Sequence, residues 1–328
     1  MRNSDNLAHQ ADNDNFQVEK TQSSQKRMKD PKNDGPSSRL KKETRLPYLL
    51  LLPTLILLGI VTLFPIIYSL VVSFSSYDTF GNATGFTGLS NYADVFSSSD
   101  FWNAIMVTLL YTLFAVSIEI VLGFTLALMV SKDGKAMRYL RWVLIIPMML
   151  SPLVVAIVFR LMLNTDMGII NYLLQGVGLP KINFLGEPTL AFMSLVFVDI
   201  WQWMPMCFLI ILAGLQALPQ DPFESAAIDG ASKFQIIRFV TIPMLKPILV
   251  VALVIRTMDA LRTFDQVFVL TQGGPGRATE TISFLMYRTS MKFTDFGFAA
   301  AGLFIVLIIT IIISTILIRM MNTTQAKN

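Results

Sequence analysis

Cysteine and histidine are scarce in this chain of 328 residues. Cys207 is the only cysteine, so no intrachain disulfide can form, and its apolar surroundings predict a packing role. His9 is the only histidine and lies in a polar stretch. A Ser/His or Cys/His catalytic pair and a metal site built from several imidazoles are therefore not expected. The sequence predicts neither catalytic nor metal-binding residues.

Charged residues are also few. They make up 15% of the chain, whereas hydrophobic residues make up 53%; an average soluble domain has about 25% charged and about 45–50% apolar residues. So much apolar surface predicts a lipid environment. The net charge is only +4, and the basic residues gather at the ends of apolar segments rather than in one patch, so no nucleic-acid partner is expected.

Residues 1–45 are rich in Asn, Gln, Ser, Lys and Asp. Such a composition offers too little apolar surface to offset the entropy of folding, which predicts a disordered tail; a docking arm for a partner is the alternative. The tail does not read as a cleavable signal peptide, because the apolar stretch that follows begins too late and is too long. A second short tail is expected at 321–328.

Between the two tails lie apolar segments long enough to cross about 30 Å of hydrocarbon as helices of about 20 residues. Because the backbone must satisfy its own hydrogen bonds in lipid, we expect an all-α membrane protein with six transmembrane helices. The segments lie near 48–74, 103–130, 141–163, 189–218, 244–270 and 297–320. The predicted organisation is a first helix and outer loop at 46–102, followed by a core at 103–320.

Lysine and arginine near the segment ends predict the orientation, since they favour the cytoplasmic side. One side of the six-helix arrangement carries 13 of them and the other carries 5. Both termini are therefore predicted to face the cytoplasm. The five on the opposite side are Arg160, Lys181, Arg277, Arg288 and Lys292.

The loop at 219–246, predicted to be cytoplasmic, has a helical pattern of its own. Asp221 can cap a first helix, with Pro222 at its first position. Gly230 suits a left-handed helix end. Ser232 can cap a second helix, which Pro243 is expected to stop. This pattern favours a helix-turn-helix that docks on another protein, although a re-entrant or packing segment is an alternative.

The same loop resembles the EAA loop of ABC importer permeases, in which Glu-Ala-Ala, three residues, Gly, nine residues and Ile-x-Leu-Pro follow one another. Here Ser225 replaces the first alanine, and the terminal stretch reads Val-Thr-Ile-Pro. In that family the loop inserts into a cleft of the ATPase subunit. The resemblance implies ATPase-coupling roles for Glu224, Ser225, Ala226, Asp229, Gly230, Phe234, Val240 and Pro243.

Further stretches resemble the carbohydrate permeases of this family, including the maltose, trehalose and glycerol-phosphate permeases. They lie at 86–92, 199–205, 212–216 and 270–281, the last reading Leu-Thr-Gln-Gly-Gly-Pro. The resemblance implies a type I ABC importer permease fold in the inner membrane. It also implies a second homologous permease subunit, two ATPase subunits that hold ATP-Mg, and a sugar-binding protein outside the membrane. No cofactor is expected on this chain itself, which lacks a Gly-x-x-x-x-Gly-Lys-Ser/Thr loop.

Ionisable groups inside membrane helices are costly and normally face protein or water. Two interpretations remain open for the fifth segment: a self-neutralising ladder against a neighbouring helix, or the lining of a substrate cavity. For Asp199 alone the sequence favours a structural hydrogen-bonding role over a ligand role, and Glu119 is expected to pair at a helix contact. The candidate substrate-path residues are Asp199, Trp201, Trp203, Arg256, Asp259, Arg262, Asp265 and Gln266.

Two other functions are alternatives for this sequence. A stand-alone secondary transporter or channel would not need a helical docking loop, and it is expected to show inverted repeats with broken helices. An intramembrane aspartyl protease would need two facing aspartates, for which Asp199, Asp259 and Asp265 are available, but the signature sequences of that class are missing.

Overall fold

The computed structural model of the chain describes residues 36–78, 80–131 and 135–325. It forms two units, 1–66 and 67–328, and each is considered by itself. The first unit contains most of helix α2 (Pro36–Ser73), whose apolar part, Leu50–Ser73, is long enough to span a membrane. Residues 36–45, expected in the disordered tail, belong to this helix. The remainder of that predicted tail, 1–35, lies outside the described residues.

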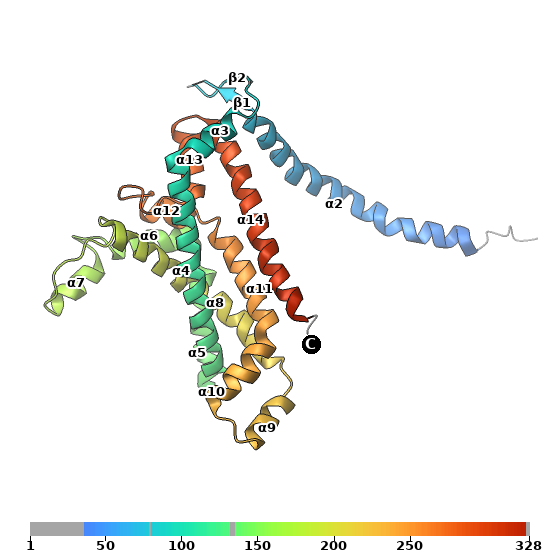
Figure 1. Cartoon of the computed structure of the whole chain (residues 1–328), viewed down its shortest axis with the longest axis vertical. Coiled ribbons are helices and arrows are strands. Elements are labelled where there is room, and N and C mark those ends of the chain that lie inside the picture. Colours follow the sequence, from blue (N-terminus) through green and yellow to red (C-terminus); the bar gives the residue numbers. More distant parts are fainter. Residues whose placement is uncertain (1–35, 79, 132–134, 326–328) are drawn as a thin grey trace, which may run out of the picture. The chain divides into compact units, whose positions relative to one another are not determined.

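Four long helices dominate the second unit (Figure 1). They are α4 (Ser99–Val130), α8 (Pro188–Gln216), α11 (Ile242–Ala260) and α14 (Phe296–Gln325). Within the described residues, five helices are long and apolar enough to cross a membrane, or six if one bent pair is a single span. The predicted number of six spans corresponds to this second count.

The bent pair is the third predicted span, at 141–163. Helix α5 (Lys135–Ile145) continues into the short 3-10 helix η1 (Ile146–Met149), and α6 (Pro152–Met162) then leaves at 97°. Ser151 is extended, with φ −63° and ψ 134°, as expected for a residue that precedes a proline. The span is therefore broken rather than straight, and Pro152 begins its second half.

The fifth predicted span, 244–270, begins and ends elsewhere. Helix α10 (Lys233–Ile236), the π-helical turn η2 (Ile237–Thr241) and α11 form one apolar run of 28 residues, Lys233–Ala260. Pro243 does not stop the helix as expected; it lies in the first turn of α11, directly after the wider π turn. The run ends at Ala260, and a separate short helix, α12 (Asp265–Leu270), follows.

Close packing of α4 against α8 forms the centre of the second unit. Gly123 of α4 allows this approach, because a Cβ there would lie 2.9 Å from the backbone nitrogen of Phe208 and 3.0 Å from Cβ of Cys207. Cys207 is a buried free thiol in the apolar cluster with Phe208 and Ile211, as its predicted packing role requires.

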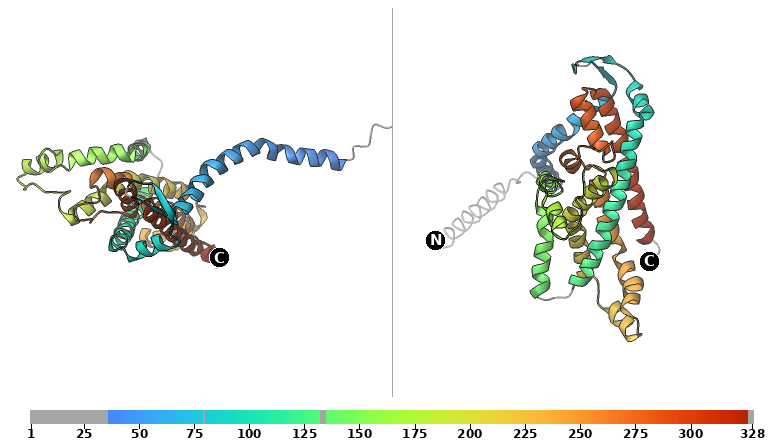
Figure 2. Two further views of the ribbon diagram at one scale, coloured as in Figure 1. Left: turned by 90° about the horizontal axis from the view of Figure 1, so that it is seen from above. Right: turned by 90° about the vertical axis from the view of Figure 1, so that its left-hand side faces the viewer.

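The two ends of the second unit differ. The hairpin of β1 (Ser75–Tyr77) and β2 (Ala83–Phe86) lies at one end, together with α3 (Ser90–Ser97) and α13 (Ile282–Lys292). Helices α9 (Asp221–Ile228) and α10 lie at the opposite end (Figure 1 and the right view of Figure 2). Helix α7 (Ile169–Gly176) precedes α8.

A cluster of charged residues connects the loop at 270–281, which contains the Gly-Gly-Pro stretch, to the hairpin end of the second unit. Arg277 pairs with Asp100 at the start of α4, and Nη1 of Arg288 lies 3.0 Å from Oε1 of the buried Glu280. Burial raises the pKa of the Glu280 carboxyl, although the two arginines oppose this shift. The loop is thus held to α4 and α13 by compensating charges.

Candidate substrate pocket and coupling loop

The predicted two-helix loop is present, and its local geometry follows from its sequence. Helix α9 ends before Gly230, whose φ is +75°, as predicted for a left-handed helix end. Ser232 caps α10 through a capping box: its hydroxyl accepts from the backbone N–H of Gln235, and the Gln235 side chain accepts from the Ser232 N–H. Asp221 does not cap α9; it is the first residue of that helix, which has no side-chain cap.

The outer surface of this loop is unusually apolar for a solvent-facing connection. Ile228, Phe234 and Phe239 are 86%, 68% and 67% exposed. The predicted coupling residues Glu224, Ser225, Asp229 and Gly230 are exposed as well, whereas Ala226 and Val240 are half-buried. This loop therefore presents several large apolar side chains on its surface.

The inner side of the loop borders a cavity of about 1050 Å³ under the end of α4. Met129 and Ser131 line it from α4 and its C-terminal end, and Phe223, Ile236 and Ile237 line it from the loop side. The loop is therefore attached to the bundle mainly through the continuous run of α10, η2 and α11. A displacement of α10 has a direct covalent route into that long helix.

At the other end of that run, Arg256 is buried and bound by carboxylates of two other helices. Its Nε donates to Oε2 of Glu119 at 2.7 Å and its Nη2 to Oε1 at 2.9 Å, a bidentate pair. Nη2 also donates to Oδ2 of Asp199 at 2.9 Å. The predicted pairing of Glu119 at a helix contact is confirmed, and its partner is Arg256 of α11.

The neighbouring charges behave differently. Arg262 is 64% exposed at its side chain and pairs with Asp259 at 3.1 Å. The predicted ladder of charges is therefore not carried by one helix, because α11 ends at Ala260 and Arg262 and Asp265 lie beyond it. Arg256 binds carboxylates of α4 and α8. The contacts that resemble the ladder are the Asp259–Arg262 pair and a longer Arg256–Asp259 pair at 4.0 Å.

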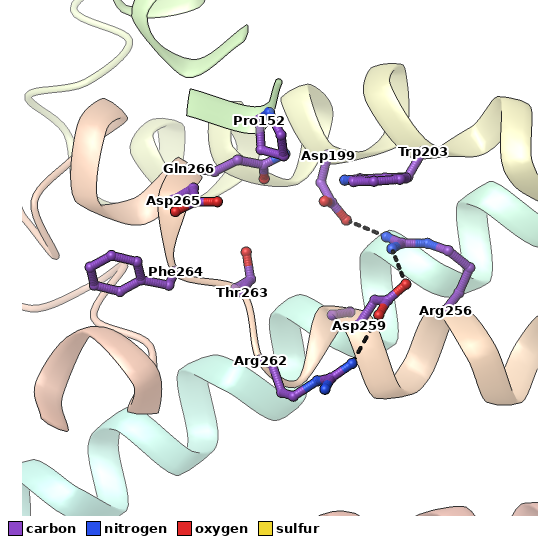
Figure 3. A pocket seen from close by; sticks show the side chains of 11 residues that line it. Pro152, Asp199, Trp203, Arg256, Asp259, Arg262, Thr263, Phe264, Asp265 and Gln266 are labelled. Carbon is purple, nitrogen blue, oxygen red and sulfur yellow. Dashed lines mark hydrogen bonds and ion pairs between the residues drawn. The ribbon is translucent and has the colours of Figure 1, made fainter. Parts of the chain in front are cut away.

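A pocket of about 370 Å³ opens beside these charges (Figure 3). It brings together seven of the eight candidate substrate-path residues, from α8, α11, the turn after α11 and α12. Trp201 is not among them; its ring packs edge-on against Phe159, with centroids 5.2 Å apart. The seven are Asp199, Trp203, Arg256, Asp259, Arg262, Asp265 and Gln266.

A buried amide network borders the pocket and was not expected from the sequence. Tyr111 Oη donates to Oε1 of Gln266 at 3.1 Å, and Nε2 of Gln266 donates to Oε1 of Gln202 at 3.0 Å. Nε2 of Gln202 in turn donates to the Leu150 carbonyl at the break of the third span. The sequence shows only that each glutamine lies in an apolar segment. It does not show which residues hydrogen-bond to each other, because the partners are far apart in the sequence.

Membrane-length helices, a polar pocket inside the bundle and an exposed two-helix loop at one end together define a membrane permease subunit. The chain belongs to the family described as "binding-protein-dependent transport system inner membrane component", whose sequence profile matches residues 119–324. It is therefore the permease subunit of an ABC importer and a multi-pass protein of the inner membrane. A permease subunit of this family is not itself catalytic.

Relatives and solved structures agree with this assignment. The chain is 42% identical to the trehalose/maltose transport system permease protein MalF of Thermococcus litoralis, over 66% of this chain and 73% of that one. It is 32% identical to the sulfoquinovosyl glycerol transport system permease protein SmoG of Agrobacterium fabrum, over 75% and 80%. A bacterial ABC transporter involved in the import of alginate has the same fold, with a TM-score of 0.76 at 24% identity, covering 87% and 99%.

Proposed function

We propose that this chain is the permease subunit of an ATP-driven importer of a sugar or oligosaccharide. The observation that carries the proposal is its 42% identity to a trehalose/maltose permease. A multiple sugar-binding transport system permease of Streptococcus mutans, 32% identical over 75% of this chain, supports the same class. The stand-alone transporter alternative is not favoured by membership in a binding-protein-dependent family.

The proposed complex contains a second homologous permease subunit, two ATPase subunits that bind ATP-Mg, and an external sugar-binding protein. The α9–α10 loop is the proposed contact with an ATPase subunit, since Phe234 and Ile228 present apolar surface and Gly230 sets the angle between the two helices. Closure of the ATPases would then move α10, and α11 would transmit that movement to the pocket.

The pocket beside Arg256 is the proposed part of the substrate path in this subunit. Its volume of about 370 Å³ falls in the range of about 300–1000 Å³ typical of small-molecule sites. Trp203 offers an apolar ring, while Thr263, Asp259 and Asp265 offer polar groups for sugar hydroxyls. The second permease subunit would supply the other half of the path.

Co-purification and uptake test this proposal together. The tagged chain, expressed with its genomic neighbours, should retain an ATPase subunit after gentle detergent extraction. The complex in proteoliposomes should then take up radiolabelled sugar only when ATP and the binding protein are both present. Sugar uptake that needs neither would support a stand-alone transporter instead.

Orientation requires a separate test. With both termini in the cytoplasm, a reporter fused after Asn91 or Gly274 should be external, and one after Ser131 or Lys233 should be cytoplasmic. The reason is the excess of lysine and arginine near the α9–α10 end. One inverted reporter would break the six-span topology at that point.

A further inference from the structure

We propose that the pocket beside Arg256 selects neutral polyhydroxylated substrates and rejects anionic ones. This inference rests on the proposed function as a sugar permease and assigns the charge class of the sugar. It depends on two features: the charge of the buried Arg256 is already paired with the carboxylates of Glu119 and Asp199, and carboxylates outnumber cations around the cavity.

The charge of Arg256 is already compensated by carboxylates of the chain. Its Nε and Nη2 are bound to Glu119 and Asp199 at 2.7–2.9 Å, and Nη1 lies 4.0 Å from Oδ2 of Asp259. Its guanidinium also lies 5.4 Å from the ring centroid of Trp203, which covers one of its faces. The side chain is only 1% exposed, and a substrate carboxylate that approached it would meet the carboxylates of Asp199 and Asp259.

The remaining charges do not create a positive surface. Arg262 is committed to Asp259 at 3.1 Å and to the carbonyl of Met258 at 3.0 Å. Asp265 is exposed and lines the cavity, and no ion pair within 4 Å is found for it in the part of the chain that the structure describes. Among the residues that line the cavity, three carboxylates (Asp199, Asp259 and Asp265) thus face two arginines.

The excess of carboxylates around the pocket favours substrates that donate hydrogen bonds and disfavours substrates that carry a negative charge. Ionised carboxylates accept hydrogen bonds only, so Asp259 and Asp265 can receive sugar hydroxyls. A uronate brought to the same place would meet like charge in a partly desolvated cavity, where repulsion is stronger than in water. Neutral sugars therefore fit this pocket, and acidic sugars are disfavoured.

The test uses the complete transporter in proteoliposomes with its binding protein. The probes are neutral di- and trisaccharides, including maltose and trehalose, each paired with its counterpart oxidised to a uronate at one sugar. We expect uptake of at least one neutral member and at most a tenth of that uptake for its uronate. Uptake of no member would overturn the proposed function as well, whereas efficient uptake of uronates would overturn the charge selection alone.

Variants separate the pocket from the binding protein, which also discriminates between ligands. Asp265→Lys should raise the ratio of uronate to neutral uptake about tenfold, because a charge-assisted hydrogen bond contributes enough for that change, and Asp265→Asn should raise it less. Asp166→Lys, which alters an exposed aspartate outside the pocket, is the matched control. Equal ratios in Asp265→Lys and Asp166→Lys would refute selection by this pocket.

Discussion

The two ends of the helical run from Lys233 to Ala260 provide the sharpest contrast in this molecule. At one end Phe234 and Ile228 are 68% and 86% exposed. At the other end Arg256 is buried, and its hydrogen-bonded carboxylate partners, Glu119 and Asp199, belong to α4 and α8 of the same chain. The first end is the proposed contact with another protein, and the second joins three helices through buried charges.

The contrast explains how one helix can serve two purposes. Buried charges are costly to separate once paired, so the Arg256 end fixes α4, α8 and α11 relative to one another. The loop end has few contacts within the chain and a local fold set by a glycine and a capping box. Changes at the two ends should therefore produce different defects: lost folding at one and lost coupling at the other.

The largest expected effect is at the buried end. Arg256→Met would leave Glu119 and Asp199 buried without their cation, which costs about 3–5 kcal/mol. Most of the folded protein should be lost from the membrane, as measured by size-exclusion chromatography and thermal unfolding in detergent. Arg262→Met is the matched control, because its salt bridge is exposed and contributes about 0–1 kcal/mol. Equal stability of the two variants would remove the distinction between the buried and exposed pairs.

Neutralising the carboxylates sharpens this first prediction. If the defect of Arg256→Met is the cost of unpaired buried charge, adding Glu119→Gln and Asp199→Asn should recover part of the folded protein. A triple variant that is less stable than Arg256→Met would show that the carboxylates have other essential contacts.

An intermediate effect is expected at Gly230. Gly230→Val places a branched side chain at φ +75°, which costs about 1–2 kcal/mol of strain, although no neighbouring atom lies within 4 Å of the new Cβ. Membrane level should stay normal while substrate-stimulated ATP hydrolysis falls. Gly230→Asn should retain most activity, since asparagine tolerates left-handed backbone. Normal coupling in the valine variant would mean that the helix angle is unimportant.

The smallest effect is expected at Ser232. Ser232→Ala removes the hydroxyl that caps α10 and costs about 1 kcal/mol. Hydrogen exchange at the Gln235 amide should then become about fivefold faster, since local opening becomes more favourable by that amount. Ser232→Asp should restore slow exchange because aspartate is also a good capping residue. Unchanged exchange in the alanine variant would mean that the capping box does not stabilise this turn.

Local features of the loop were predictable, whereas contacts between distant segments were not. Gly230 and Ser232 act through neighbours within three residues, so the sequence pattern alone indicates their geometry. Arg256 and Glu119 are 137 residues apart, and a polar residue in an apolar segment reveals the need for a partner but not which one. The end of α11 at Ala260 was missed because the charges at 256–265 keep a three-residue spacing that a continuous helix would also show.

The structural effect of the prolines also could not be predicted from the local sequence. Pro152 coincides with a true break, since the span bends by 97° before it. Pro243 resembles a helix stop, but the π turn at Ile237–Thr241 accommodates it and the helix continues. The choice between these outcomes depends on packing around the proline, which the local sequence does not contain.

The exposed end of this helical run is the proposed docking surface for an ATPase subunit. Retention of that subunit by the tagged complex tests it directly, with Phe234→Ala compared with Phe234→Leu. The alanine variant should lose most of the ATPase subunit while its membrane level and thermal unfolding match those of the unmodified chain, and the leucine variant should retain it. Full retention by Phe234→Ala together with Glu224→Lys would contradict the claim.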